Sequence, residues 1–211
     1  MRITIFLFDG VTALDAIGPY ESLARLPDVL IQFVGKTKGL VRTGDGFLAL
    51  HADADISSVR EADILIIPGG HRKGLAATMP DPEVQEWIRT IDEGSRWTAS
   101  VCTGSLILGS AGVLAGRKAS THWRAKGALA RFNVEYSADR VTIDGKYMTS
   151  AGVSAGLDMG LKLCADLAGH DVAEAIQLSM QYDPKPPFDT GDPATAATTE
   201  RVYLIENVLR Q

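Results

Sequence analysis

Hydrophobic runs alternate with amphipathic segments along most of the chain. Residues 2–8 and 63–67 are rich in large apolar side chains, which is typical of strands buried on both faces. Apolar positions then recur at helical spacing from about 15 to 25 and from 81 to 93. Strands that alternate with helices predict an α/β protein whose mostly parallel sheet is covered by helices on both faces.

The remaining segments continue this alternation. A strand is predicted at 30–34, and the polar, glycine-rich section 35–50 predicts a hairpin. Further strands are expected at 97–101, 132–136, 141–143 and 146–149, and further helices at 103–114, 155–168, 171–182 and 199–209. We expect one domain over residues 1–211, with its C-terminal segment 184–211 packing as an extended stretch plus a helix.

Charge and composition narrow the possible partners. The formal charge of −5 and the pI near 5.4 argue against nucleic acid or an anionic membrane as the main partner. No apolar run reaches the roughly 18 residues that span a bilayer, and residues 1–8 lack a signal-peptide cleavage site. Two cysteines are too few for a disulfide framework and fit a reducing compartment. We therefore expect a cytoplasmic protein.

Cys102 stands where a predicted strand ends and a predicted helix begins. The free N–H groups and the positive end of a helix favour a thiolate over a thiol, so this position predicts a reactive cysteine. The alternative is a buried cysteine that acts as a small hydrophobic side chain. That second interpretation is favoured for Cys164, which lies on an apolar helix face.

Three predicted strands are followed by residues that can carry chemistry: Asp15, the pair Gly69 and Gly70, and Cys102. Carboxyl ends of neighbouring parallel strands converge in space, so these groups are expected to meet. Backbone N–H groups of Gly70 and Thr103 would then stabilise an anion beside the sulfur. Alternatively, Pro68–Gly70 is only a turn and Asp15 only an acid in the first turn of a helix.

Asp15 has a predicted role of its own beside the cysteine. A negative sulfur nearby, together with partial burial, would raise the pKa of its carboxyl and keep it protonated. Two histidines are further candidates. His71 follows Gly70 closely enough to border the site, and His122 is either a distant base or, as we favour, a structural or pocket-lining residue.

Several motifs together resemble the ThiJ/PfpI superfamily, which is related in fold to class I glutamine amidotransferases. They are the segments 8–15 (FDGVTALD) with Gly18-Pro19, 67–70 (IPGG) and 101–104 (VCTG). The segments 121–123 (THW) and 186–191 (PPFDTG) point to the branch of isocyanide (isonitrile) hydratases and related regulator domains. The resemblance covers nearly the whole chain.

This resemblance implies a flavodoxin-like three-layer sandwich, a nucleophile-elbow cysteine and a homodimer. It implies that the Cys102 thiolate attacks an isocyanide carbon, that Asp15 protonates the adduct or activates water, and that a thioimidate is hydrolysed to an N-substituted formamide. Gly69, His71, His122 and Val153 would contact the substrate, and no metal or organic cofactor is implied. Thr103 stands where PfpI-type proteins have a histidine, so a Cys-His peptidase is not expected.

Other functions remain open from the sequence. An oxidative-stress sensor needs the same activated cysteine, which would be oxidised to a sulfenic or sulfinic acid. A glyoxalase or deglycase is less favoured because the acid is Asp15 and not a glutamate. A ligand-sensing domain of a transcription regulator would need an additional basic DNA-binding domain, for which we expect no room in this chain.

Overall fold

A seven-stranded sheet forms the centre of the protein in a computed structural model, which describes residues 1–208. Its strand order is β10-β11-β7-β6-β1-β2-β5, and every neighbouring pair is parallel except β10 with β11. The strands of this sheet are β1 (Arg2–Leu7), β2 (Leu30–Gly35), β5 (Ala54–Asp55), β6 (Ile64–Ile67), β7 (Trp97–Val101), β10 (Val141–Asp144) and β11 (Tyr147–Ser150). The expected mostly parallel sheet is confirmed.

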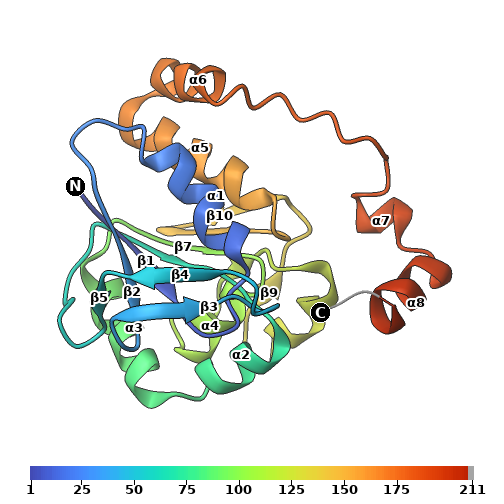
Figure 1. The fold of residues 1–211 in the computed structure, drawn as a ribbon, viewed down its shortest axis with the longest axis horizontal. Helices are drawn as coiled ribbons and strands as arrows, with labels where there is room; N and C mark the ends of the chain where they lie inside the picture. The colour runs from blue at the N-terminus through green and yellow to red at the C-terminus, as the bar shows by residue number, and fades with distance from the viewer. Residues whose placement is uncertain (209–211) are drawn as a thin grey trace.

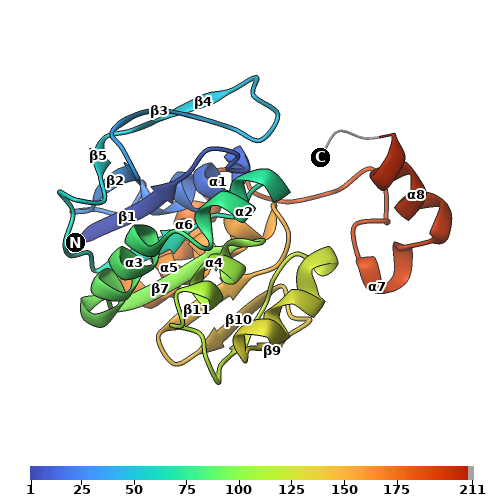
Figure 2. The same cartoon turned by 90° about the horizontal axis from the view of Figure 1, so that it is seen from below.

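Helices cover both faces of this sheet, which gives the three layers expected of a flavodoxin-like fold (Figures 1 and 2). The helices of the domain are α1 (Ala13–Leu23), α2 (Arg72–Thr78), α3 (Pro82–Gly94), α4 (Gly104–Ser110), α5 (Ala155–Ala168) and α6 (His170–Ser179). On one face α1 packs against α5, and on the other α3 packs against α4. β1 and β6 are buried almost throughout, as their hydrophobic sequences predict.

The α1–α5 contact is close because small residues line it. A Cβ atom at Gly160 of α5 would collide with the Ser22 hydroxyl and would lie 3.0 Å from the Cα of Pro19. A Cβ at Gly156 would lie 3.2 Å from both Pro19 and Val101. These glycines allow α1 to lie close to α5 and to the end of β7, which brings the start of α1 beside the strand that carries the cysteine.

Smaller elements surround the sheet. β3 (Gly39–Arg42) and β4 (Ala49–Ala52) form the hairpin expected within 35–50, and the Val11–Thr43 bridge joins it to the loop after β1. β8 (Lys118–Ala119) pairs with β9 (Glu135–Tyr136) beside a 3-10 helix, η1 (Trp123–Phe132). The expected strand at 132–136 is therefore wrong at its start, because 123–132 forms helical turns that end at Asn133 with positive φ.

Two further differences concern helices. The helix expected over 103–114 ends at Ser110, and turns that include Gly112 and Gly116, both with positive φ, follow it. The sequence pattern does not predict the short helix α2, because glycine and lysine interrupt its apolar positions. By contrast, the Asp81 side chain accepts hydrogen bonds from the N–H groups of Glu83 and Val84, as expected for a residue that precedes a helix with Pro82 in its first turn.

The C-terminal segment leaves the body of the protein after α6 (Figures 1 and 2). An extended stretch leads to α7 (Pro193–Ala196) and α8 (Thr199–Asn207). No residue of α8 is buried within the described chain, and a 3.2 Å ion pair between Arg124 and Glu206 links this helix to η1. The expected end of this helix at 209 lies outside the described residues. Within residues 1–208, no helix is both long and apolar enough to cross a bilayer.

Candidate active site

Cys102 occupies a sharp turn between β7 and α4. Its φ of +58° lies in the left-handed region, which a residue with a Cβ adopts only when its surroundings hold it there. Its N–H donates to the carbonyl oxygens of Ser150 (3.1 Å) and Ala151 (2.9 Å). Gly104 is required two residues later, because a Cβ there would collide with the Ile67 carbonyl oxygen. This strand–cysteine–helix junction has the conformation of a nucleophile elbow.

Asp15 lies in the first turn of α1 with no exposed surface. Its Oδ2 accepts a 3.0 Å hydrogen bond from the Gly69 N–H, while its buried Oδ1 has no hydrogen-bond partner among residues 1–208. Burial raises the pKa of this carboxyl to about 7, although the Gly69 N–H and the neighbouring Cys102 thiol lower it. The predicted raised pKa is confirmed in direction; of its two predicted causes, burial raises the pKa, whereas the cysteine lowers it.

The thiol of Cys102 is buried beside this carboxyl. Burial, followed by the charge of Asp15, raises the pKa of Cys102 to about 12. The N–H groups of Val153 and Thr103 and the Thr103 hydroxyl lower that pKa, but they do not outweigh burial. The expectation of a resting thiolate at the start of a helix is therefore wrong: the thiol holds its proton more tightly than the Asp15 carboxyl does.

The Gly70 N–H is bonded to the Thr103 hydroxyl and not to the Cys102 sulfur. It donates to Thr103 Oγ1 at 3.1 Å. The expectation that this N–H faces the sulfur directly is therefore wrong. The Thr103 hydroxyl donates to the Gly70 carbonyl oxygen at 3.4 Å, and it also lies close enough to the Cys102 sulfur to lower the pKa of that thiol. Position 69 has no space for a side chain, because a Cβ there would lie 2.9 Å from Asp15 Oδ2 and would overlap the Thr103 hydroxyl.

Val153 meets Cys102 through its backbone. Its N–H is a hydrogen-bond donor to the Cys102 sulfur, and its φ of +23° is a strained value for a β-branched residue. The sequence marked Val153 as a residue that contacts the substrate. Its backbone contact with the sulfur is not predictable from the sequence, because no local pattern signals a positive φ at a valine.

His122 precedes η1 at the edge of this site. Its Nδ1 accepts a 3.3 Å hydrogen bond from the Arg124 N–H, so a neutral ring carries its proton on Nε2. Burial and the Arg124 charge lower the pKa of His122. The ring packs on Gly152, where an added Cβ would lie 2.9 Å from its Cδ2. The neighbouring Thr121 hydroxyl donates to the Cys102 carbonyl oxygen at 3.1 Å.

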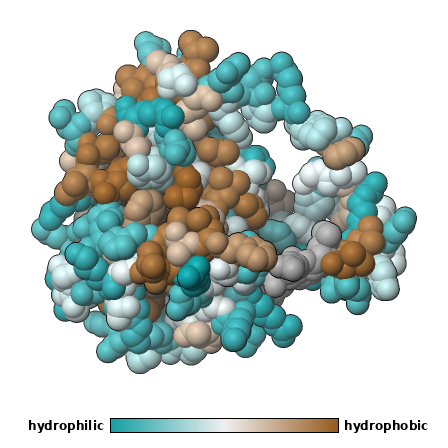
Figure 3. All heavy atoms as spheres, in the orientation of Figure 1, coloured by the Kyte–Doolittle hydropathy of each residue, from teal (hydrophilic) through white to brown (hydrophobic). Residues whose placement is uncertain are grey.

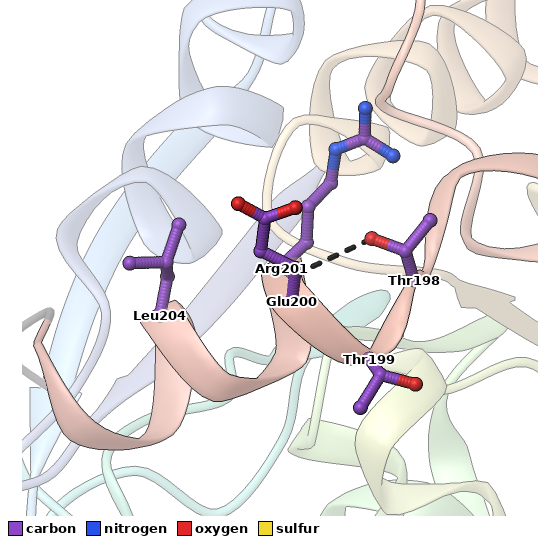
Figure 4. Close-up of a pocket in the computed structure, with 5 residues that line it drawn as sticks. All are labelled: Thr198, Thr199, Glu200, Arg201 and Leu204. Atoms are coloured by element: carbon purple, nitrogen blue, oxygen red, sulfur yellow. Dashed lines mark hydrogen bonds between the residues drawn. The ribbon is translucent and has the colours of Figure 1, made fainter.

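The other candidates have different surroundings. The half-buried His71 packs its ring on Gly44 in the β3–β4 turn, and its backbone N–H donates to the Gly10 carbonyl oxygen at 2.8 Å, so none of these contacts is with Cys102. Cys164 is fully buried, as expected. A separate hollow of about 570 Å³ involves none of these residues; it is lined by Thr198, Thr199, Glu200, Arg201 and Leu204 (Figure 4).

Comparison with known proteins places the chain in a family. The model of the DJ-1/PfpI family matches residues 1–166. The chain belongs to the DJ-1/PfpI family. It is 39% identical to isonitrile hydratase from Pseudomonas putida over 196 residues, which cover 93% of this chain and 85% of that relative. This agrees with the resemblance inferred from the motifs.

Other DJ-1/PfpI proteins show how far the similarity extends. The crystal structure of a ThiJ/PfpI family protein from Pseudomonas syringae has a TM-score of 0.92 and 37% identity, over 97% of this chain and 84% of that one. The glutathione-independent glyoxalase DJ-1 of Schizosaccharomyces pombe is 23% identical over 85% of this chain and 98% of its own. The family therefore includes enzymes with different reactions.

Proposed function

We propose that this protein is a cysteine-dependent hydratase that converts an organic isocyanide to the N-substituted formamide. The observation that carries the proposal is the buried Asp15 carboxyl beside the Cys102 thiol, with an oxygen that has no partner among residues 1–208. An isocyanide carbon must receive both a nucleophile and a proton, and this pair supplies both. The 39% identity to an isonitrile hydratase supports the same reaction.

The reaction begins with the ionised form of Asp15. As the Cys102 sulfur attacks the terminal carbon of R–N≡C, the thiol proton passes to the Asp15 carboxylate. Asp15 then delivers this proton to the same carbon, which gives the thioimidate R–N=CH–S–Cys102. The N–H groups of Val153 and Thr103 and the Thr103 hydroxyl stabilise negative charge on the sulfur while the bond forms.

Hydrolysis returns the enzyme to its starting state. Asp15 takes a proton from a water molecule that adds to the thioimidate carbon, and it passes this proton to the nitrogen. The C–S bond then breaks with its electron pair on sulfur, Cys102 recovers a proton, and R–NH–CHO leaves. The balance is one isocyanide and one water for one formamide. In this scheme Gly69 orients Asp15, Gly70 orients the Thr103 hydroxyl, and His122 borders the substrate.

We further propose a cytoplasmic homodimer that acts on small molecules. Hydrophobic side chains gather over the middle of the face shown in Figure 3, where α1 and the β3–β4 hairpin lie in Figure 1. Leu14 is 41% exposed, and the hairpin leaves Leu40, Phe47 and Leu48 exposed. An apolar surface of this kind supports association of two copies.

One assay tests the proposed reaction. Purified protein is incubated with several alkyl and aryl isocyanides, and formamide is measured by chromatography. We expect catalytic turnover by the wild type and none by Cys102→Ala, with Cys164→Ala as the matched cysteine control that stays active. Absence of turnover with every isocyanide would refute the proposal. Methylglyoxal as a parallel substrate tests the glyoxalase alternative, which the relative from S. pombe supports.

A further inference from the structure

The segment 150–153 surrounds Cys102 with backbone groups. The carbonyl oxygens of Ser150 and Ala151 accept the Cys102 N–H, and the Val153 N–H is a donor to the sulfur. Val153 reaches this position only with the strained φ of +23°. A strained turn relaxes unless contacts on both sides hold it, so the neighbours of this segment determine where the amide points.

Arg140 makes contacts on both sides of the turn. Its carbonyl oxygen accepts the Ala151 N–H at 2.9 Å, before Val153. After Val153, its Nε donates to Asp158 Oδ2 at 2.6 Å and its Nη2 donates to Ser154 Oγ at 3.2 Å. Both acceptors belong to the start of α5. One residue from the loop before β10 therefore holds the two ends of the turn that presents an N–H to the sulfur.

A second contact fixes the acidic partner of Arg140. The Tyr182 hydroxyl donates to Asp158 Oδ1 at 3.2 Å, so each oxygen of this carboxylate has its own donor. The Arg140 and Asp158 side chains are 53% and 30% exposed. An ion pair this exposed adds little to global stability. Its consequence is therefore expected to be local, at the first turn of α5 and the amide before it.

We propose that Arg140 is a positioning residue for Cys102: with Asp158 and Ser154 it holds the strained Val153 turn so that the Val153 N–H faces the sulfur. This inference rests on the proposed role of Cys102 as the nucleophile. Arg140 touches neither the sulfur nor the substrate in this account. It controls the reactivity of Cys102 through the backbone, because a thiolate is stabilised by an N–H only when that N–H points at it.

Alkylation of Cys102 by iodoacetamide is the test, because it needs no isocyanide. The rate is followed by intact mass between about pH 6 and pH 10, and peptide mapping assigns the label to Cys102. We expect Arg140→Ala to slow alkylation at least about fivefold at each pH in this range, since a hydrogen bond to the charged sulfur is weakened and the thiolate fraction falls. Asp15 from α1 and His122 at η1 are titratable groups beside this segment and are unchanged in all variants.

Conservative variants separate positioning from folding. Arg140→Lys keeps the charge but replaces the two donor nitrogens of the planar guanidinium by a single one, so its alkylation rate is expected to fall between those of wild type and Arg140→Ala. Asp158→Asn is expected to slow alkylation as well. If Arg140→Ala does not fold, Arg140→Lys and Asp158→Asn decide the question on their own. In the hydratase assay these variants are expected to lower kcat with little change in KM, because the substrate is not contacted.

Arg96→Ala is the matched control. Arg96 pairs with Asp166 at 2.7 Å near the other end of α5, with exposures of 57% and 38%, and Trp97 also donates to that carboxylate. We expect its alkylation rate to stay within about twofold of wild type, as for other exposed ion pairs. The inference is overturned if Arg140→Ala and Asp158→Asn react like wild type, or if Arg96→Ala slows the reaction equally. Failure of isocyanide turnover with slowed alkylation would overturn the proposed reaction and leave this inference standing.

Discussion

Asp15 gives up its proton before Cys102 does, although a thiol and a carboxyl this close compete for one negative charge. Burial raises the pKa of Asp15 to about 7 and, with the Asp15 charge, raises that of Cys102 to about 12. Near neutral pH the pair therefore holds a thiol beside a carboxylate for part of the time. In that form Asp15 can accept the thiol proton as the sulfur attacks, which is general-base catalysis within a buried pair.

Asp15→Asn separates the ionisation of Cys102 from turnover. The substitution removes the neighbouring charge, so the pKa of Cys102 falls and its alkylation at alkaline pH speeds up. Isocyanide turnover is nevertheless expected to fall about 10²-fold or more, because the amide cannot carry the proton from sulfur to carbon. Alkylation rates and formamide formation on the same preparation check both parts. Unchanged turnover would exclude Asp15 as the proton carrier.

The stability of the wild type is expected to fall as the pH rises from about 4 to about 7 and to level off above that. The folded-state pKa of Asp15 lies above its ordinary value of 3.8, so the stabilisation from proton binding is present below that value and is lost as the pH passes about 7. From pH 5 to pH 8 the loss amounts to roughly 2–3 kcal/mol. Asp15→Asn has no carboxyl at this position, so it lacks this pH-dependent stabilisation. Urea unfolding of both proteins at the two pH values measures it, and equal pH dependence would contradict the raised pKa.

Thr103→Val tests the hydroxyl between Gly70 and the sulfur. The valine keeps the shape but leaves the Gly70 N–H without its acceptor and the sulfur without the hydroxyl donor. We expect a loss of about 1–3 kcal/mol in the free energy of unfolding and slower alkylation of Cys102. Thr103→Ser keeps the hydroxyl and should restore both. If the valine variant matches wild type in both measurements, the hydroxyl has no role.

Gly69→Ala tests the close approach at the end of β6. The added Cβ would lie 2.9 Å from Asp15 Oδ2 and overlap the Thr103 hydroxyl, so the site must shift. Isocyanide turnover is expected to fall at least about tenfold through misplacement of Asp15. Gly94→Ala is the control, because a Cβ there meets nothing within 4 Å at the end of α3. Equal activity of the two variants would show that the space at Gly69 is not needed.

The fold and the main residues of the site could be predicted because strand ends converge. The buried runs that form β1 and β6, and the cysteine after β7, indicate which groups share the carboxyl edge of the sheet. Asp15, Gly69 and Cys102 meet there as predicted. These features depend on the spacing of apolar residues and on the order of the strands, and both can be inferred from a single sequence.

The electrostatics and the backbone contacts could not be predicted in the same way. The helix position of Cys102 suggested a thiolate, but the depth of burial that reverses this belongs to the packing of α1, α5 and β7. The Gly70 N–H is taken by Thr103 Oγ1, a side-chain conformation that no sequence pattern specifies. The strained φ of Val153 and the Arg140 contacts come from segments distant in sequence, which meet only in the folded protein.

A covalent adduct on Cys102 is the most direct test of the central claim. Wild-type protein is mixed with an aryl isocyanide, quenched in acid within one turnover, and analysed by intact mass and peptide mapping. We predict a mass increase equal to the intact isocyanide, located on Cys102, which appears before formamide and decays as formamide forms. Formamide production by Cys102→Ala at the wild-type rate, with no adduct in the wild type at any time, would contradict the claim.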